Sequence, residues 1–353
     1  MITTSPLSRQ PDLRRPKAAW QRALSEAICD PLELCRVLGL DPALALGARA
    51  ASTHFPLRVP RGFVHRMRHG DLQDPLLRQV LPLPSEAVTT PGFSADPLSE
   101  RAAMRAPGLL HKYQGRALLI TTEACAVHCR YCFRREFPYE RTHGDGGRFR
   151  EALDAVAADD SIHELILSGG DPLSLGNERL LRLSEELRSI AHLRRLRLHT
   201  RTPIVLPERV DDELLAWLRA LPWPCVIVLH CNHASEIDAS VREATTLLKG
   251  TGATLLNQSV LLAGVNDAAD TLCELSEALW SAGVLPYYLH LLDRVTGTAH
   301  FEVGELRARE LMQQITGRLP GYLVPRLARE SPGTPSKTVL APGWDALHSP
   351  PQP

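Results

Sequence analysis

The chain has 353 residues, of which 44% are hydrophobic, so it is long enough for one large domain with additions or about two ordinary domains. Its 40 basic residues balance 40 acidic ones, which argues against a general nucleic-acid or membrane-surface protein, because such a protein needs an excess of basic residues. No stretch of about 20 apolar residues is present, and the first residues lack the apolar segment of a secretory signal. We therefore expect no nucleic-acid partner and no membrane association.

Residues 1–106 contain helix-like segments separated by Pro and Gly, without the alternation typical of strands, and predict a helical N-terminal region. From about residue 107 onward, short apolar runs alternate with longer helical stretches. We predict strands at 116–122, 164–167, 195–199, 225–229, 254–260 and 285–289, with helices between them at 148–158, 178–190, 211–221, 235–249 and 270–282. These repeats in residues 107–330 predict an α/β fold with a parallel sheet curled into a barrel or partial barrel. Residues 331–353 are predicted to form a loop and a C-terminal tail.

Polar residues follow or end the predicted strands. They are Ser168–Asp171 after the second strand, His199, Thr200 and Arg201 at the third, His230, Asn232 and His233 after the fourth, Asn257, Gln258 and Ser259 in the fifth, and His290 and Asp293 at the sixth. In βα barrels, reactive groups gather where the C-terminal ends of the strands converge. We therefore expect the functional site at that end of the sheet.

Three cysteines, Cys125, Cys129 and Cys132, lie in the run CAVHCRYCFRR directly after the first predicted strand. The spacing Cys-x3-Cys-x2-Cys lets one short loop bind three irons of a [4Fe–4S] cluster and leaves the fourth iron open to a small molecule. A zinc site completed by His128 or His143 is the alternative. Zinc is less favoured, because the chain has no second Cys-x2-Cys pair.

The other five cysteines are spaced irregularly and are expected to be ordinary, mostly buried thiols: Cys29, Cys35, Cys225, Cys231 and Cys273. Free thiols and an oxygen-sensitive cluster both fit a reducing compartment, so we expect a cytoplasmic protein.

The cysteine spacing, with the aromatic Tyr131 before the last cysteine, resembles that of the radical S-adenosylmethionine (SAM) enzymes. Three more stretches resemble the lysine 2,3-aminomutases, which combine radical SAM chemistry with pyridoxal 5'-phosphate (PLP): LSGGDPL at 167–173, LNQSVLLAGVND at 256–267 and PGTPSK at 332–337. The resemblance implies a partial (βα)6 radical SAM barrel and an isomerase that moves an amino group within its substrate. Its implied cofactors are a [4Fe–4S] cluster, SAM and PLP.

The resemblance also implies roles for individual residues. The implied cluster ligands are Cys125, Cys129 and Cys132. The implied contacts to SAM and other cofactor atoms are Ser168, Gly169, Gly170, Asp171, Tyr131, His230 and Gln258, and those to the PLP phosphate are Arg116 and Tyr113. The implied substrate contacts are Arg134, Asp293 and Glu330. Lys337 is the implied catalytic residue, which binds PLP as a Schiff base. Thr334, Pro335 and Ser336 stand where the family usually has glycines, so the loop before Lys337 should be stiffer.

Within that family the chain resembles the shorter, elongation factor P–specific branch, because few residues follow Lys337 and the stretches LRVPRGF (57–63), PGFSADPL (91–98) and YLVPRLARE (322–330) look like that branch. The implied reaction converts (S)-α-lysine to (R)-β-lysine, which a separate ligase attaches to elongation factor P. An electron donor such as a flavodoxin or ferredoxin is the further implied partner. The alternatives are an aminomutase that makes free β-lysine as a metabolite, a radical SAM enzyme without PLP, and a non-catalytic metal-binding scaffold.

Overall fold

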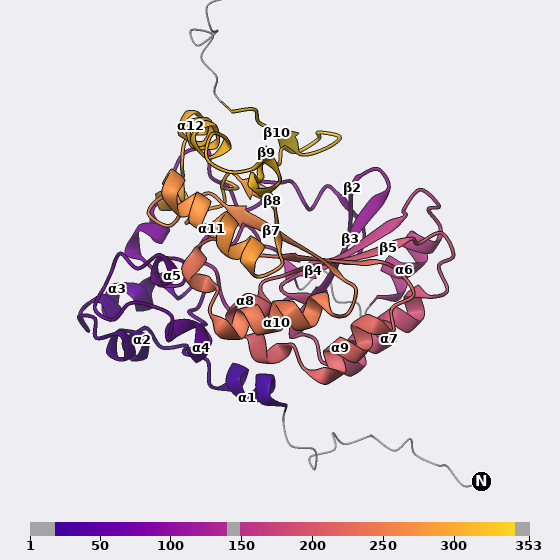
Figure 1. Ribbon diagram of the computed structural model, residues 1–353, viewed down its shortest axis with the longest axis horizontal. Coiled ribbons are helices and arrows are strands. Elements are labelled where there is room, and N and C mark those ends of the chain that lie inside the picture. Colours follow the sequence, from indigo (N-terminus) through magenta and orange to yellow (C-terminus); the bar gives the residue numbers. More distant parts are fainter. Residues whose placement is uncertain (1–17, 140–148, 343–353) are drawn as a thin grey trace, which may run out of the picture.

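The computed structural model describes residues 18–139 and 149–342, and Figure 1 shows their arrangement. One 10-stranded sheet forms the centre, and its strands follow one another in chain order from edge to edge. They are β1 (Met104–Ala106), β2 (Leu109–Tyr113), β3 (Arg116–Thr122), β4 (Glu164–Gly169), β5 (Arg195–Thr200), β6 (Cys225–Leu229), β7 (Thr254–Val260), β8 (Leu285–His290), β9 (Arg326–Arg329) and β10 (Thr338–Val339). In these two ranges, no helix has the length and apolar character needed to cross a lipid bilayer.

The sheet is a partial barrel. Strands β3 to β9 are parallel to one another, whereas β1 and β2 at one edge and β10 at the other are joined to the sheet by antiparallel pairing. Within the described chain the two edge strands, β1 and β10, are not neighbours in the sheet, so the barrel stays open. The six predicted strands are confirmed as β3 to β8. Strand β9 is a seventh parallel strand, which the sequence did not predict because its four residues, RLAR, contain no apolar run.

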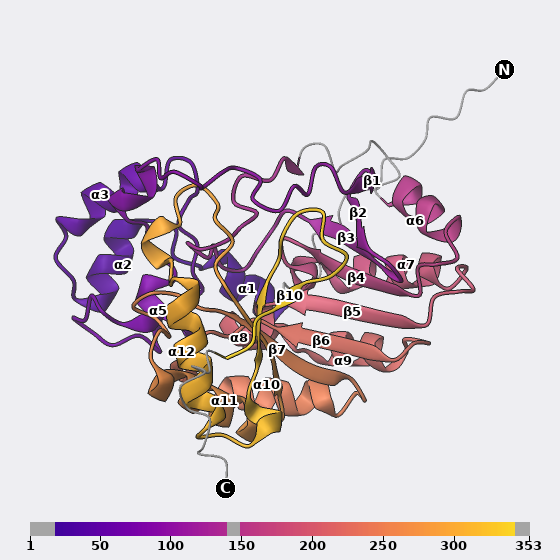
Figure 2. The same ribbon diagram turned by 90° about the horizontal axis from the view of Figure 1, so that it is seen from above.

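Helices connect the parallel strands and cover the outer face of the sheet (Figures 1 and 2). They are α6 (Arg150–Ala157), α7 (Asn177–Leu187), the short α8 (Thr202–Val205), α9 (Asp212–Arg219), α10 (Ala239–Lys249), α11 (Ala269–Ser281) and α12 (Glu305–Thr316). The five helices predicted between the strands are confirmed as α6, α7, α9, α10 and α11; the first four are shorter than predicted, and α11 is shifted by one residue. For example, α10 begins only at Ala239, because the side chain of Asp238 accepts a hydrogen bond from Val241 N (2.9 Å) and thereby caps the helix.

The N-terminal region consists of short helices that pack against one side of the barrel (Figure 1). They are α1 (Ala19–Ser25), α2 (Pro31–Leu38), α3 (Leu44–Ala51), α4 (Arg61–Val64) and α5 (Pro75–Arg78). Gly39, with a φ of 64°, ends α2 in a left-handed conformation that favours glycine. Phe63, Leu76 and Leu77 are fully buried in the same hydrophobic cluster as the inner strands, so this region and the barrel share one core.

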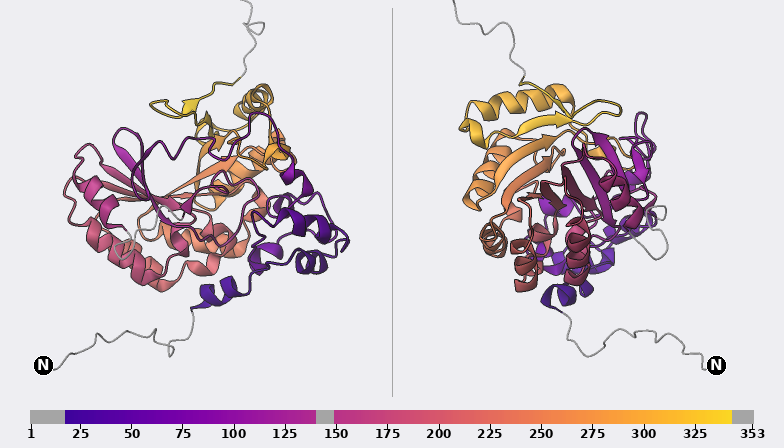
Figure 3. Two further views of the ribbon diagram at one scale, coloured as in Figure 1. Left: turned by 180° about the vertical axis from the view of Figure 1, so that it is seen from behind. Right: turned by 90° about the vertical axis from the view of Figure 1, so that its right-hand side faces the viewer.

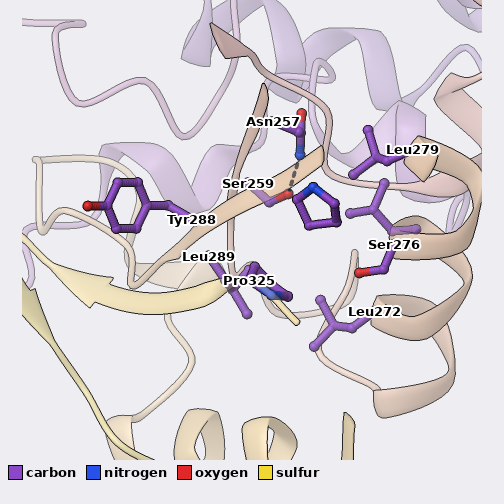
Figure 4. A pocket seen from close by; sticks show the side chains of 10 residues that line it. Asn257, Ser259, Leu272, Ser276, Leu279, Tyr288, Leu289 and Pro325 are labelled. Carbon is purple, nitrogen blue, oxygen red and sulfur yellow. Dashed lines mark hydrogen bonds between the residues drawn. The ribbon is translucent and has the colours of Figure 1, made fainter. Parts of the chain in front are cut away.

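Strand β7 illustrates how alternation divides polar residues between the core and the opposite face. Asn257 and Ser259 point toward α11, where Asn257 Nδ2 donates to Ser259 Oγ (2.9 Å) among buried leucines such as Leu272 (Figure 4). Asn257 Oδ1 also accepts from Cys231 N (2.9 Å), which fixes the chain just after β6. Only Gln258, between them, lines the large cavity described below, so one of the three polar residues predicted for the site at this strand reaches it.

A buried ion triad joins the N-terminal region to the cysteine loop. Glu86 accepts hydrogen bonds from Arg130 (Nε 2.9 Å and Nη2 2.5 Å) and from Arg135 Nη2 (2.8 Å). The three side chains are at most 4% exposed, and the ring of Phe55 lies against both guanidinium groups. The backbone adds a further link, because Arg130 N donates to Gln79 O (2.9 Å). The N-terminal region therefore holds the loop that carries the three cysteines.

We expect Glu86→Ala to lower the free energy of unfolding by about 3–5 kcal/mol, because it leaves two buried arginines without their carboxylate. The matched control is Glu305→Ala, since Glu305 also pairs with two arginines, Arg309 and Arg329, but at the surface. The control should lower the free energy of unfolding far less, because water screens an exposed ion pair. Urea denaturation of both variants measures the difference, and equal destabilisation would contradict this account of the triad.

Candidate active site

One cavity of about 510 Å³ opens on the inner side of the sheet and at the C-terminal ends of its strands. Every residue to which the resemblance assigned a role lines this cavity: Cys125, Cys129, Cys132, Arg116, Tyr113, Tyr131, Arg134, Ser168, Gly169, Gly170, Asp171, His230, Gln258, Asp293, Glu330 and Lys337. Of the other polar residues noted at the strand ends, Asn232, His233, Asn257 and Ser259 do not line it. The residues with assigned roles come from β2, β3, β4, β7, the loops that follow β3, β4, β6, β8 and β9, and the segment just before β10. The predicted convergence at the strand ends is therefore present in the structure.

The three loop cysteines are free thiols that line one end of the cavity. The other five cysteines of the chain do not line it. Burial and the neighbouring Cys129 raise the pKa of Cys132 to about 11, and burial raises the pKa of Cys125 well above its usual value. Metal binding at this loop must therefore displace protons from the thiols. Three cysteines without a fourth fit a cluster that keeps one open iron.

The zinc alternative needs a histidine beside the cysteines. His128 points away from the cavity, with Nδ1 2.8 Å from Pro56 O and its ring stacked on Phe55. His143 lies outside the described residues. Among the described residues, no three His, Cys, Asp or Glu side chains form a group that would hold a single metal ion. His128 is thus a packing residue of the loop and not a candidate ligand.

Gly169 and Gly170, at the end of β4, lie so close to the backbone of the cysteine loop that a side chain would not fit. A Cβ atom on Gly169 would lie 2.7 Å from Thr122 O, and one on Gly170 would lie 2.4 Å from Ala124 O. Gly169 also has a φ of 120°, which disfavours other residues. The sequence suggested that these glycines let a ligand approach closely. In the structure, both glycines line the cavity, and both also let the end of β4 lie against the backbone of the cysteine loop.

Asp171 organises the ends of two strands. Its carboxylate accepts hydrogen bonds from Thr200 Oγ1 (2.7 Å), Arg201 N (2.7 Å) and Thr202 N (2.9 Å) after β5, and from Leu173 N (3.0 Å) in its own loop. Each of the two carboxylate oxygens accepts two of these four hydrogen bonds. Asp171 therefore positions the backbone that carries Arg201, although its side chain also borders the cavity.

A buried polar network lies behind the cysteine loop and centres on the hydroxyl of Tyr131. His230 Nε2 lies 2.9 Å from this oxygen, Asn232 Nδ2 donates to it at 2.7 Å, and Arg201 Nη1 donates to it at 2.5 Å. Burial lowers the pKa of His230 well below its usual value, so the imidazole is neutral. One of its ring nitrogens can therefore accept a hydrogen bond.

Four members of this network, Gln79, Arg201, Asn232 and Glu236, were not assigned site roles from the sequence. Arg201 and Asn232 were among the polar residues noted at the ends of the predicted strands, but no specific role was predicted for them. Gln79 and Glu236 carry no such signal. They come from the N-terminal region and from the turn before α10, and only the fold brings them together.

Alternating charges run along the other wall of the cavity, from Arg134 through Glu100, Lys112 and Glu330 to Lys337. Arg134 Nε and Nη2 donate to the two oxygens of Glu100 (2.8 and 2.9 Å), and Lys112 Nζ lies 3.4 Å from Glu100 and 2.9 Å from Glu330. Glu330 also pairs with Lys337. Glu100 and Lys112 were missed from the sequence, because neither lies in a recognised motif. Lys112 lies in β2, and Glu330 directly follows β9. In the right-hand view of Figure 3, the purple strands near the start of the sheet lie on the same side of the molecule as the yellow segment near its end.

The pairing sets the protonation of these carboxylates. Burial alone would raise the pKa of Glu330, but the charges of Lys337 and Lys112 outweigh it and lower the pKa to about 2. Asp293 differs, because its carboxylate makes no hydrogen bond or ion pair with any described residue. Burial, together with the charge of Glu330, raises the pKa of Asp293 to about 7. A buried carboxylate of this kind is suited to an incoming cation.

A second group of cavity residues fits an anionic, aromatic ligand. The guanidinium of Arg116 lies 4.7 Å from the centre of the Tyr113 ring. His199 Nε2 is a buried atom without a hydrogen-bond partner among the described residues. Buried polar atoms are normally satisfied, so this nitrogen awaits a ligand or water. The donors present here suit a phosphate and polar ring substituents, as PLP would offer.

The loop before Lys337 contains Gly333, whose φ is 74°, as its only glycine. The hydroxyl of Thr334 lies 2.8 Å from Ser331 O and 2.9 Å from Ser336 O, and so links the two sides of the turn. A glycine at position 334 could not make these contacts. The stiffness of the loop stays a prediction.

Comparison with known proteins identifies the class. Residues 119–251 match the radical SAM superfamily. The chain is 49% identical over 322 residues to the L-lysine 2,3-aminomutase of Escherichia coli (91% of this chain, 94% of the relative) and 44% identical over 335 residues to that of Haemophilus influenzae (95% and 99%). It is 34% identical over 275 residues to the L-lysine 2,3-aminomutase of Clostridium subterminale (78% and 66%).

The fold, the three-cysteine loop and the superfamily match define a radical SAM enzyme, a class that uses a [4Fe–4S] cluster and SAM. The chain belongs to the L-lysine 2,3-aminomutase family, whose members also use PLP, and it is an isomerase. This assignment sets aside the alternative of a non-catalytic metal-binding scaffold.

Proposed function

We propose that the enzyme converts (S)-α-lysine to (R)-β-lysine with PLP bound to Lys337, and that the product serves to modify elongation factor P. The observation that carries the proposal is the single cavity, in which the three cysteines, Arg134, Asp293 and Lys337 face one another. Its volume of about 510 Å³ is within the range of about 300–1,000 Å³ of small-molecule sites. A deep site of this kind excludes water from reactive species.

The charges along the cavity match the groups of lysine. Glu100 occupies Nε and one N–H of Nη2 of Arg134, and Nη1 donates to Ser168 Oγ (3.1 Å). The guanidinium lines the cavity and has a further N–H on Nη1 and on Nη2, which we assign to the α-carboxylate. Asp293 supplies a carboxylate for the side-chain ammonium. Glu330 is the second acid near that end, but it is already shared by Lys112 and Lys337. We therefore assign the recognition of the ammonium chiefly to Asp293.

The cofactors supply the radical chemistry and the carrier for the migrating amino group, and the protein positions them. The three cysteines would hold the cluster, the glycines after β4 would border SAM, and Arg116 with Tyr113 would hold the phosphate of PLP. Lys337 supplies the amine that binds PLP, and when that amine is released as an ammonium, Glu330 lies beside it to accept a hydrogen bond. Arg134 and Asp293 fix the two ends of the substrate.

The proposed use of the product rests on the resemblance to the elongation factor P–specific branch in stretches such as 57–63 and 322–330. The higher identity to the E. coli and H. influenzae relatives than to the C. subterminale relative, 49% and 44% against 34%, is compatible with it. We place the reaction in the cytoplasm, with a flavodoxin or ferredoxin as electron donor and with a separate ligase as the next enzyme. Free thiols throughout the described chain agree with a reducing compartment.

Deletion of the gene tests this use of the product. We expect elongation factor P from the deletion strain to lose a mass increment equal to one lysine residue, and added β-lysine to restore it. Mass spectrometry of the purified factor measures this. If the factor keeps the full modification while cellular β-lysine disappears, the product is a free metabolite, and the alternative function applies.

The chain has only four lysines, and two of them, Lys112 and Lys337, reach the cavity, so the attachment site of PLP can be tested sharply. We expect borohydride treatment of the enzyme with PLP to place a pyridoxyl group on the peptide that contains Lys337. Lys337→Ala should lose this label and all turnover, whereas Lys112→Ala should keep the label. Lys249→Ala, in α10, is the control and should match the wild type. Peptide mass spectrometry decides, and a label on Lys112 would overturn the assignment.

The raised pKa of Asp293 predicts a pH dependence of lysine binding. Below about pH 7 the carboxyl of the free enzyme is protonated and cannot pair with an ammonium. The KM for lysine should therefore fall as the pH rises from 6 to 8, by roughly tenfold per pH unit well below the pKa. Asp293→Asn should raise the KM and remove this dependence. A variant with an unchanged pH profile would show that another group binds the ammonium.

A further inference from the structure

Arg201 is the one charged side chain that donates directly to a cysteine of the cluster loop in the described structure. It follows β5, and its side chain is only 7% exposed. Arg201 Nη1 lies 2.8 Å from Cys129 Sγ and also donates to Tyr131 OH, whereas Nη2 donates to Gln79 Oε1 (2.7 Å) and Glu236 Oε2 (2.9 Å). The guanidinium thus faces a sulfur on one side and a carboxylate on the other.

The surroundings fix this guanidinium in place. Asp171 accepts a hydrogen bond from Arg201 N, and the rings of Phe63 and Tyr131 each lie 5.6 Å from the guanidinium carbon. Glu236 is itself fully buried and accepts hydrogen bonds from Asn232 N (2.9 Å), among other donors. Arg201 therefore has little freedom to leave the sulfur.

We propose that Arg201 is a positioning residue that sets the reduction potential of the cluster through the sulfur of Cys129, with Glu236 as its counter-charge. Hydrogen bonds to cluster sulfurs and nearby charges are two of the factors that tune such potentials. A donor and a positive charge at the sulfur stabilise the reduced cluster, which carries one more negative charge. A buried carboxylate on the far side of Arg201 partly cancels this effect.

Because the two charges have opposite signs, the proposal predicts shifts in opposite directions. Arg201→Gln should lower the midpoint potential of the cluster, because it removes the cation beside Cys129. Glu236→Gln should raise it, because it leaves Arg201 without its counter-charge. Arg201→Lys keeps the positive charge but loses the guanidinium that donates to both Cys129 and Glu236. It should lower the midpoint potential less than Arg201→Gln does. General destabilisation of the protein would not produce shifts of opposite sign.

The experiment is a redox titration, followed by electron paramagnetic resonance, of anaerobically reconstituted full-length enzyme without SAM, PLP or lysine. The matched control is Arg209→Lys, since Arg209 is also buried but its guanidinium donates to Leu173 O and Leu175 O and does not line the cavity. Its potential should equal that of the wild type. Iron and sulfide content is measured for every variant, so that only loaded protein is compared.

The proposal rests on the [4Fe–4S] cluster of the family but not on the proposed substrate or on PLP, so its outcome is separate from that of the proposed function. Loaded Arg201 and Glu236 variants with the wild-type potential, or with shifts of the same sign, overturn it. If Arg201→Gln does not take up a cluster, the test is whether Arg201→Lys and Glu236→Gln shift the midpoint potential in opposite directions. A wild-type protein that takes up no [4Fe–4S] cluster overturns both this inference and the radical chemistry.

Discussion

The position of the three thiols depends on a carboxylate that lies outside the barrel. Glu86 sits between Arg130 and Arg135 in a site almost closed to water, and those arginines flank the segment that carries Cys132. Water cannot compensate a broken pair there, so the loop is held where the N-terminal region places it. The short helices before residue 106 thus support the active site, although they supply none of the three cysteines of the loop.

Charge balance is the second organising constraint. Arg134, Glu100, Lys112, Glu330 and Lys337 alternate in sign along one wall, and each member neutralises its neighbours within a buried space. Asp293 stands apart from this series, and its carboxylate has no cationic partner among the described residues. A cavity that balances its own charges but leaves one carboxylate unmatched is prepared for a ligand with a matching cation. The same principle relates Arg201 and Glu236 behind the cysteine loop.

Several polar residues near the strand ends use their hydrogen bonds to organise the backbone. Asp171 receives four hydrogen bonds from its own loop and from the end of β5, and Asn257 binds the backbone after β6. Asp171 also borders the cavity, whereas Asn257 points away from it, so a polar residue at a strand end can support the site, line it or do both. These cases look alike in the sequence, and only the direction of the side chain separates them.

The sequence by itself determined the repeating strands and helices, the cysteine loop, and many of the residues that line the cavity. These follow from local patterns and motif spacing, because an apolar run or a short ligand loop is encoded in neighbouring residues. Tertiary structure alone decided that β9 joins the parallel sheet, that Glu100 and Lys112 complete the charged wall, and that Gln79, Arg201 and Glu236 meet behind Cys129. Those contacts join residues from distant segments, such as Gln79 and Arg201, so no local pattern could predict them.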